Sequence, residues 1–137
     1  KERNKSKLVQ KLKNLKNKKQ IIKEIHKKLL RKYSNNKIKV WIVNGFLVRS
    51  IFFLDFTEGG HDKVYKFVPK NEVWIDDALN SRELKYVLIH ELHERALIKK
   101  GLSYNEAHDL SSKIELFCRK HPKKVDKTLK KELEKNK

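Results

Sequence analysis

The positive charge of this 137-residue chain lies almost entirely at its two ends, which limits where a hydrophobic core can form. Residues 1–34 contain 14 Lys and Arg against 2 acidic residues, and residues 119–137 contain 9 against 3. The segment 35–118 is neutral, with 12 residues of each sign. A chain of this length supports one domain with a single core. We therefore expect the core in the middle of the chain, between two basic arms.

Residues 1–36 have the pattern of a basic helix. Across residues 5–32, apolar side chains recur at spacings of three, four and seven, which is the period of one helical stripe. The residues of this stripe are Leu8, Leu12, Leu15, Ile22 and Leu29. Ser34, Asn35 and Asn36 end the pattern. At the other end of the chain, we expect residues 121–137 to be a polar, basic tail that forms a helical arm.

The first half of the middle segment, 37–120, predicts a short antiparallel sheet. Residues 37–43 alternate in polarity, Asn44-Gly45 is a hairpin turn signal, and residues 46–56 are too rich in β-branched and aromatic residues for a surface helix. A second turn at 57–62, a further alternating run at 63–68 and a last strand at 72–76 follow. The pattern therefore favours three or four strands in meander order.

Two helices should complete an α+β fold. Asn80 with Glu83 is a capping box that opens a helix running to Lys100, and Gly101 is suited to close it. A second capping box, Ser103 with Glu106, opens a helix that should end near residue 120, where His121-Pro122 stops it. The expected domain thus consists of a short sheet packed on these helices.

The first of these helices contains the run His90-Glu-Leu-His-Glu94. His90 and Glu94 are one turn apart on one face, so they can hold one ion from the same side, while Glu91 points about 100° away. This is the arrangement of the H-E-x-x-H zinc helix, in which the Glu beside the first ligand is a general base. Glu94 stands in the position of the second His, and a carboxylate can also bind zinc.

Other ligand sets fit the same sequence. His93 is three residues from His90 and could bind beside it, with Glu94 then hydrogen-bonded to a ligand. The following helix offers His108 and Glu115 as a third ligand, and His61 in the turn at 59–61 is a looser candidate. We favour His90, Glu94 and His108, with zinc as the expected cofactor.

The cluster also has two explanations without a metal. The same side chains could form a structural hydrogen-bond network. Alternatively, His93 and Glu94 are solvated, and Glu91 makes an ordinary i, i+4 pair with Arg95.

A resemblance can be stated on these motifs. A sheet, a helix with His-Glu-x-x-(His/Glu) and a second helix with a further ligand are similar to the zincin-like metallopeptidases. The pattern Gly59-Gly-His61, Asn71-Glu-Val-Trp-Ile-Asp76, His90-Glu-Leu-His-Glu94 and Ala107-His108 also resembles small uncharacterised proteins of phages and archaea. The likeness covers residues 38–118. It implies a fold but no assigned activity, whereas the resemblance to the zincin-like metallopeptidases implies a peptide or protein substrate.

The leading hypothesis is therefore a metal-dependent hydrolase, a peptidase, with Glu91 as its general base. The alternatives are a non-catalytic protein that binds nucleic acid through its basic arms and a structural metal-binding module. Lysines outnumber arginines 29 to 6, and arginine is the residue that reads phosphates in bidentate fashion. Cys118 is the single cysteine. The sequence also has no apolar run of about 18 residues and no signal peptide. Together with the single cysteine, these features predict a cytoplasmic protein that does not insert into a membrane.

Overall fold

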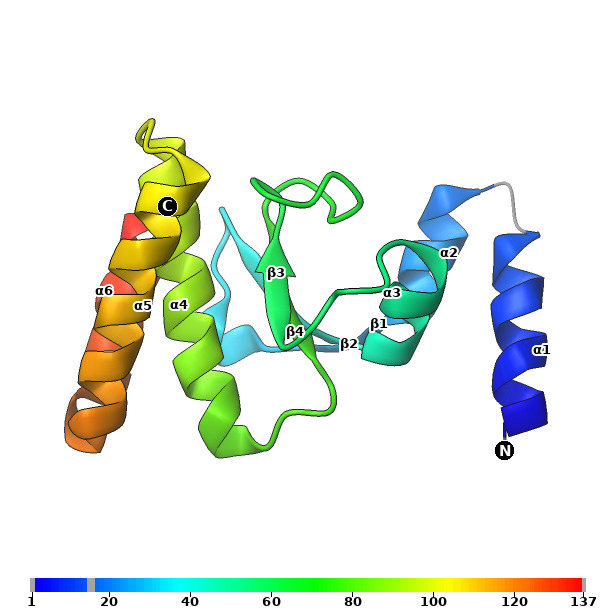
Figure 1. Cartoon of the computed structure of the whole chain (residues 1–137), viewed down its shortest axis with the longest axis horizontal. Coiled ribbons are helices and arrows are strands. Elements are labelled where there is room, and N and C mark those ends of the chain that lie inside the picture. Colours follow the sequence, from blue (N-terminus) through cyan, green and yellow to red (C-terminus); the bar gives the residue numbers. More distant parts are fainter. Residues whose placement is uncertain (1, 15–16, 137) are drawn as a thin grey trace.

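A four-stranded sheet lies at the centre of the computed structural model, which describes residues 2–14 and 17–136 (Figure 1). Its strands are β1 (His26–Leu29), β2 (Lys39–Val43), β3 (Gly59–His61) and β4 (Glu72–Asp76), in the order β1-β2-β4-β3. The predicted α+β class, with a short sheet packed on helices, is confirmed. The predicted meander is wrong, because the two central strands, β2 and β4, run parallel to each other.

The parallel pair arises because a helix, and not a hairpin, follows β2. The side chain of Asn44 accepts a hydrogen bond from the backbone N–H of Leu47 at 3.2 Å and so caps α3 (Gly45–Ile51). Leu47 and Val48 of this helix are buried. Asn44 is therefore a helix N-cap, and the strand expected over 46–56 is wrong. Leu47 and Val48 form the buried face of this helix, which ends at Ile51.

Two further strand assignments change around the edge of the sheet. The segment 57–62, expected as a turn, contains β3, which pairs antiparallel with β4. The segment 63–68, expected as a strand, contains turns and no strand. The glycines explain the first difference: a Cβ on Gly59 would lie 2.9 Å from the carbonyl oxygen of Trp74 and 3.1 Å from Val87. Glycine thus allows β3 to approach both β4 and the helix beside it.

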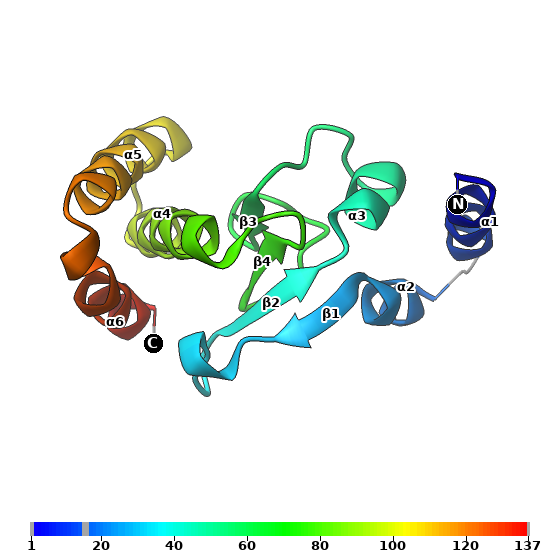
Figure 2. The ribbon, with the colours of Figure 1, turned by 90° about the horizontal axis from the view of Figure 1, so that it is seen from below.

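Helices α4 (Ser81–Lys99) and α5 (Tyr104–Lys120) form where the capping signals placed them. Asn80 Oδ1 accepts from the Glu83 N–H at 2.8 Å, and Ser103 Oγ accepts from the Glu106 N–H at 3.2 Å. Gly101, with a φ of 108°, ends α4 in a conformation that other residues rarely adopt. The short connection between the helices lays them side by side (Figure 2).

The C-terminal segment is helical, as expected, but it is part of the packed domain and not a separate polar tail. After a 3₁₀ turn (Pro122–Lys124), α6 (Val125–Lys135) packs against α4. Val125 and Leu129 are buried in the same core as β4 and α4. Figure 2 shows α4, α5 and α6 grouped at one end of the molecule. The segment packs on the core because its apolar residues recur every four positions among the lysines and form a helical stripe.

The N-terminal segment is also not one helix. Its elements are α1 (Glu2–Lys13), α2 (Lys18–Ile25), strand β1 and a 3₁₀ turn (Arg31–Tyr33). Leu12 and Ile25 are buried with α3 and the second face of the sheet. Leu15 of the predicted stripe lies outside the described residues. Among the described residues, no helix is both long enough and apolar enough to span a membrane.

The sheet therefore separates two cores. Along β4, Val73 and Ile75 face the core shared with α4 and α6, and Trp74 faces the core shared with α1, α2 and α3. This alternation is the usual period of a strand covered on both faces. It fixes α4 against the sheet, with β3 as the edge strand beside it.

Candidate metal centre

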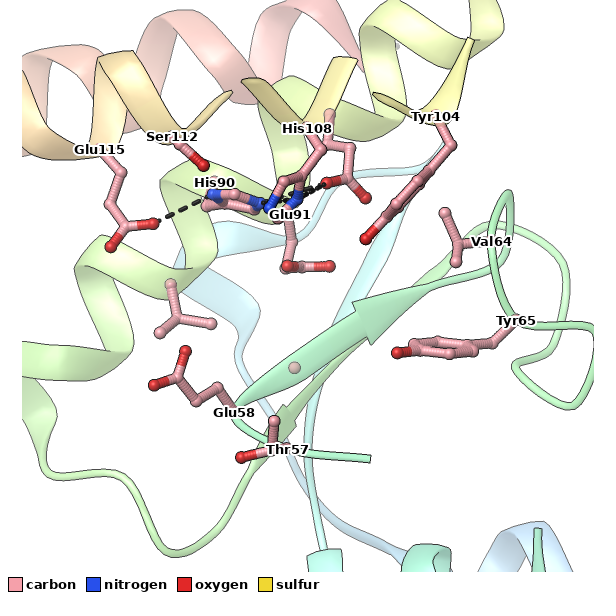
Figure 3. Close-up of a pocket in the computed structure, with 13 residues that line it drawn as sticks. Thr57, Glu58, Val64, Tyr65, His90, Glu91, Tyr104, His108, Ser112 and Glu115 are labelled. Atoms are coloured by element: carbon pink, nitrogen blue, oxygen red, sulfur yellow. Dashed lines mark hydrogen bonds and ion pairs between the residues drawn. The ribbon is translucent and has the colours of Figure 1, made fainter. Parts of the chain in front are cut away.

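A pocket of about 310 Å³ opens between β3, α4 and α5. Figure 3 shows that side chains from α4, from α5 and from the segments on either side of β3 point into it. The face of α4 that carries His90, Glu91 and Glu94 forms one wall, and His108 of α5 lies opposite. The remaining lining residues are Thr57, Glu58, Gly59, Val64, Tyr65, Val87, Tyr104, Ser112 and Glu115.

His90, Glu94 and His108 place three potential ligand atoms in a triangle. His90 Nε2 lies 3.1 Å from Glu94 Oε2 and 3.2 Å from His108 Nδ1, and His108 Nδ1 lies 3.1 Å from the same Glu94 oxygen. His90 and Glu94 are buried, and the side chain of His108 is 44% exposed. The structure thus brings together the three residues that the sequence suggested as ligands.

The dimensions of the triangle suit a tetrahedral ion. Zinc–nitrogen and zinc–oxygen bonds of about 2.0–2.1 Å place neighbouring ligands of a tetrahedron about 3.3 Å apart. The two ring nitrogens of the triangle cannot both carry a proton. If both ring nitrogens carried protons, two donors would face each other at 3.2 Å. At least one nitrogen therefore presents a lone pair beside the carboxylate oxygen, as a cation requires.

Glu94 is oriented from its other side by His61. His61 is fully buried, and its Nδ1 accepts a hydrogen bond from the backbone N–H of Lys63 at 3.2 Å. The ring proton therefore lies on Nε2, which donates to Glu94 Oε1 at 2.9 Å. His61 is thus a residue that positions Glu94, and it leaves Oε2 of Glu94 free to form one corner of the triangle. Burial raises the pKa of Glu94, but the hydrogen bonds from His61 and His90 outweigh it and lower the pKa to about 2.

Glu115, the alternative third ligand, contacts the far side of His90. Its Oε1 lies 3.0 Å from His90 Nδ1, an ion-pair distance without good hydrogen-bond geometry, and its other oxygen accepts from Arg119 Nε at 2.9 Å. Burial lowers the pKa of His90, but Glu115 and Glu94 outweigh it and raise the pKa to about 10. A cation that binds Nε2 must therefore displace a proton from His90.

Glu91 projects into the pocket without joining the triangle (Figure 3). One of its carboxylate oxygens lies within 4.8 Å of an oxygen of Glu94. It makes no hydrogen bond to another described side chain. Burial and the nearby charge of Glu94 raise the pKa of Glu91 to about 8. The same geometry also groups Glu91 with His61 and Glu94 as a second potential ligand set, although His61 has both ring nitrogens engaged.

Two of the sequence-based alternatives are excluded by the geometry. His93 points away from the pocket, and its Nδ1 lies 2.8 Å from Glu132 of α6, so it cannot share an ion with His90. Arg95 is almost fully buried and does not pair with Glu91. Its guanidinium donates to both carboxylate oxygens of Asp62, at 2.6 and 3.3 Å. Glu94 is likewise buried and not solvated.

Several residues of the pocket were not identified as site residues from the sequence. The rings of Tyr65 and Tyr104 flank the pocket, with their hydroxyls directed toward its centre (Figure 3). Burial is the main cause that raises the pKa of each tyrosine. Glu58 adds a carboxylate from a backbone position with a φ of 63°. The cue for Tyr104 is its place four residues before His108 on one helical face, where the two rings stack with centroids 5.5 Å apart.

Comparisons of the chain with protein-family models, with curated proteins and with solved structures found no match.

Proposed function

We propose that this protein is a metal-dependent hydrolase of the zincin-like kind, which cleaves a peptide bond in a peptide or protein. His90, Glu94 and His108 would bind zinc or a similar divalent ion, and Glu91 would act as the general base. The observation that carries the proposal is the triangle of ligand atoms, 3.1–3.2 Å apart, at the wall of a pocket.

The donor set favours catalysis over a purely structural ion. Structural zinc sites are closed by four protein ligands, whereas catalytic sites combine three ligands, such as two histidines and a carboxylate, with one open position. The triangle here has that composition, and it faces a pocket of about 310 Å³. An ion bound there would polarise a substrate carbonyl and make water a stronger acid.

The position of Glu91 supports a role as the base that accepts the proton of an attacking water. Its carboxylate shares the pocket with the triangle but does not belong to it. Its raised pKa, about 8, would fall with a divalent cation close by, because a nearby positive charge favours the ionised carboxylate. Glu91 would then be ionised near neutral pH, with a pKa suited to proton transfer.

The two tyrosines are candidates to stabilise negative charge on the substrate. Their raised pKa values keep the hydroxyls protonated, and both hydroxyls are directed toward the pocket centre. Donors aimed at a developing oxyanion contribute substantially to acyl-transfer catalysis. Tyr65 comes from the loop after β3 and Tyr104 from the first turn of α5, so a substrate would lie between the two.

The test is the variant Glu91→Gln, which keeps the shape of the side chain but removes its basic carboxylate. We expect bound metal and melting temperature to persist, while cleavage of a mixed peptide library falls by about 10²–10⁴. His121→Asn is the control, because His121 is exposed and does not line the pocket. Loss of metal in Glu91→Gln would make Glu91 a ligand. Unchanged cleavage would remove it as the base, and metal binding without wild-type cleavage would favour a structural metal module.

A further inference from the structure

A second, larger pocket lies on a different part of the molecule. This open pocket lies between α2 and the sheet and has a volume of about 880 Å³. It shares no lining residue with the metal pocket. We call it the α2 groove. Its lining consists of Lys18, Lys19, Ile22, Lys23, His26, Trp41, Pro69 and Glu72.

One side of the α2 groove is cationic. Lys18, Lys19 and Lys23 of α2 are exposed, and no acidic side chain among the described residues pairs with them. Lys27 shows the contrast, because its ammonium lies 2.9 Å from Asp77. The three lysines thus offer their charge to a ligand within a chain whose formal net charge is +18.

The acid in the α2 groove is largely buried and already bound by protein contacts. Oε1 of Glu72 lies 2.8 Å from His26 Nε2 and accepts a hydrogen bond from Trp74 Nε1 at 2.9 Å. Its side chain is only 14% exposed. Glu72 therefore holds His26 in place and leaves the lysines as the accessible charges of the groove.

The rest of the α2 groove is flat and apolar. The rings of His26 and Trp41 stack with centroids 3.9 Å apart and planes only 4° from parallel. Ile22 and Pro69 extend this apolar surface. A stacked pair of rings next to unpaired lysines combines the two features by which proteins hold single-stranded nucleic acid, namely base stacking and phosphate neutralisation.

We propose that the α2 groove binds single-stranded nucleic acid. Phosphates lie along Lys18, Lys19 and Lys23, and a base packs on the His26–Trp41 rings. An acidic peptide would use the lysines but not the flat rings, and duplex would keep its bases away from them. This function is separate from the proposed hydrolase, and either can fail without the other.

The first test measures the charge contribution. Binding of a fluorescein-labelled thymidine oligonucleotide is followed by anisotropy at several salt concentrations. In the triple variant Lys18→Gln, Lys19→Gln, Lys23→Gln, the log–log salt slope should be smaller in magnitude by about 2, since each single-strand phosphate contact contributes about 0.7. The matched control is Lys123→Gln, Lys127→Gln, Lys131→Gln, which removes the same charge from exposed positions at the opposite end of the molecule (Figure 1). Equal loss in both triple variants would overturn the proposal.

The second test measures stacking. Trp41 and Trp74 are the two tryptophans, and Trp74 is fully buried, so fluorescence quenching by an unlabelled oligonucleotide should come from Trp41. Trp41→Phe should remove the quenching and retain most of the affinity, whereas Trp41→Leu should weaken binding about tenfold. Polyglutamate of matched charge should bind more weakly and cause no quenching. Equal affinity for polyglutamate would overturn the proposal in favour of an acidic protein partner.

Discussion

The Nε2 atom of His61 lies 2.9 Å from Oε1 of Glu94, a buried contact between residues 33 positions apart. It joins the end of β3 to the middle of α4. Because His61 donates to one carboxylate oxygen, Glu94 directs the other toward His90 and His108. Partners of this kind are important in metal sites, since they fix the orientation of the ligand.

Replacing His61 should therefore weaken metal binding without removing a ligand. We expect His61→Leu to lower zinc affinity about 10–100-fold, as measured by competition with a chromophoric chelator. His61→Gln retains an amide donor and should recover part of this loss. If His61→Leu binds zinc as tightly as the wild type while its melting temperature is lower, the contact is only structural.

Arg95 should be important for the stability of the fold and not for metal binding. Its buried guanidinium is bonded to Asp62, Asn71 and Asn136, which tie the loop after β3 and the end of α6 to α4. Arg95→Met leaves Asp62 as an uncompensated buried charge and should cost about 3–5 kcal/mol in urea unfolding.

The double variant Arg95→Met, Asp62→Asn should recover part of that cost, because it removes the unpaired charge together with its partner. Glu91→Gln should be much milder, since Glu91 makes no bond to Arg95. A loss below about 1 kcal/mol in Arg95→Met would show that the buried pair is weaker than its geometry indicates.

The Asp62–Arg95 pair also predicts a pH dependence. Burial raises the pKa of Asp62, but the hydrogen bonds from Arg95 and Asn71 outweigh it, so the folded-state pKa lies below the ordinary value of 3.8. A lowered pKa gives stability that is complete above the unfolded pKa, about 3.9, and is lost as the pH falls through the folded value.

The difference in unfolding free energy between the wild type and Asp62→Asn should therefore be constant above about pH 5 and narrow below pH 4. Urea unfolding from pH 3 to pH 7 measures it. A difference that widens toward acid would contradict the assignment.

The site was predictable from the sequence to the extent that its residues share local helical geometry. His90 and Glu94 are one turn apart on α4. The capping residues Asn80 and Ser103 correctly predicted where α4 and α5 begin. A short connection then brings His108 opposite. The contacts of His61 and Asp62 with α4 could not be predicted, because they depend on how closely β3 approaches the helix, and the glycine at 59 gave no indication of that distance.

The fold was mispredicted where local signals compete. Asn44-Gly45 fits a hairpin turn as well as a helix cap, and the aromatic residues after it favour a strand. The side chain of Asn44 accepts a hydrogen bond from the backbone N–H of Leu47, and the burial of one face of α3 stabilises the helix over the strand. In α6, lysines surround a narrow apolar stripe that includes Leu129. Charge alone suggested a solvated segment, whereas the burial of that stripe against α4 provides the stability of a helix.

The central claim is that His90, Glu94 and His108 bind a divalent metal, and metal stoichiometry tests it most directly. Protein purified without a histidine tag, stripped with a chelator and titrated with zinc should bind one ion per chain. His108→Ala should weaken binding strongly with little loss of stability, because this ring is 44% exposed, and His90→Ala with Glu94→Ala should abolish it. His121→Ala should bind as the wild type does. Wild-type protein that stays metal-free in excess zinc would contradict the account.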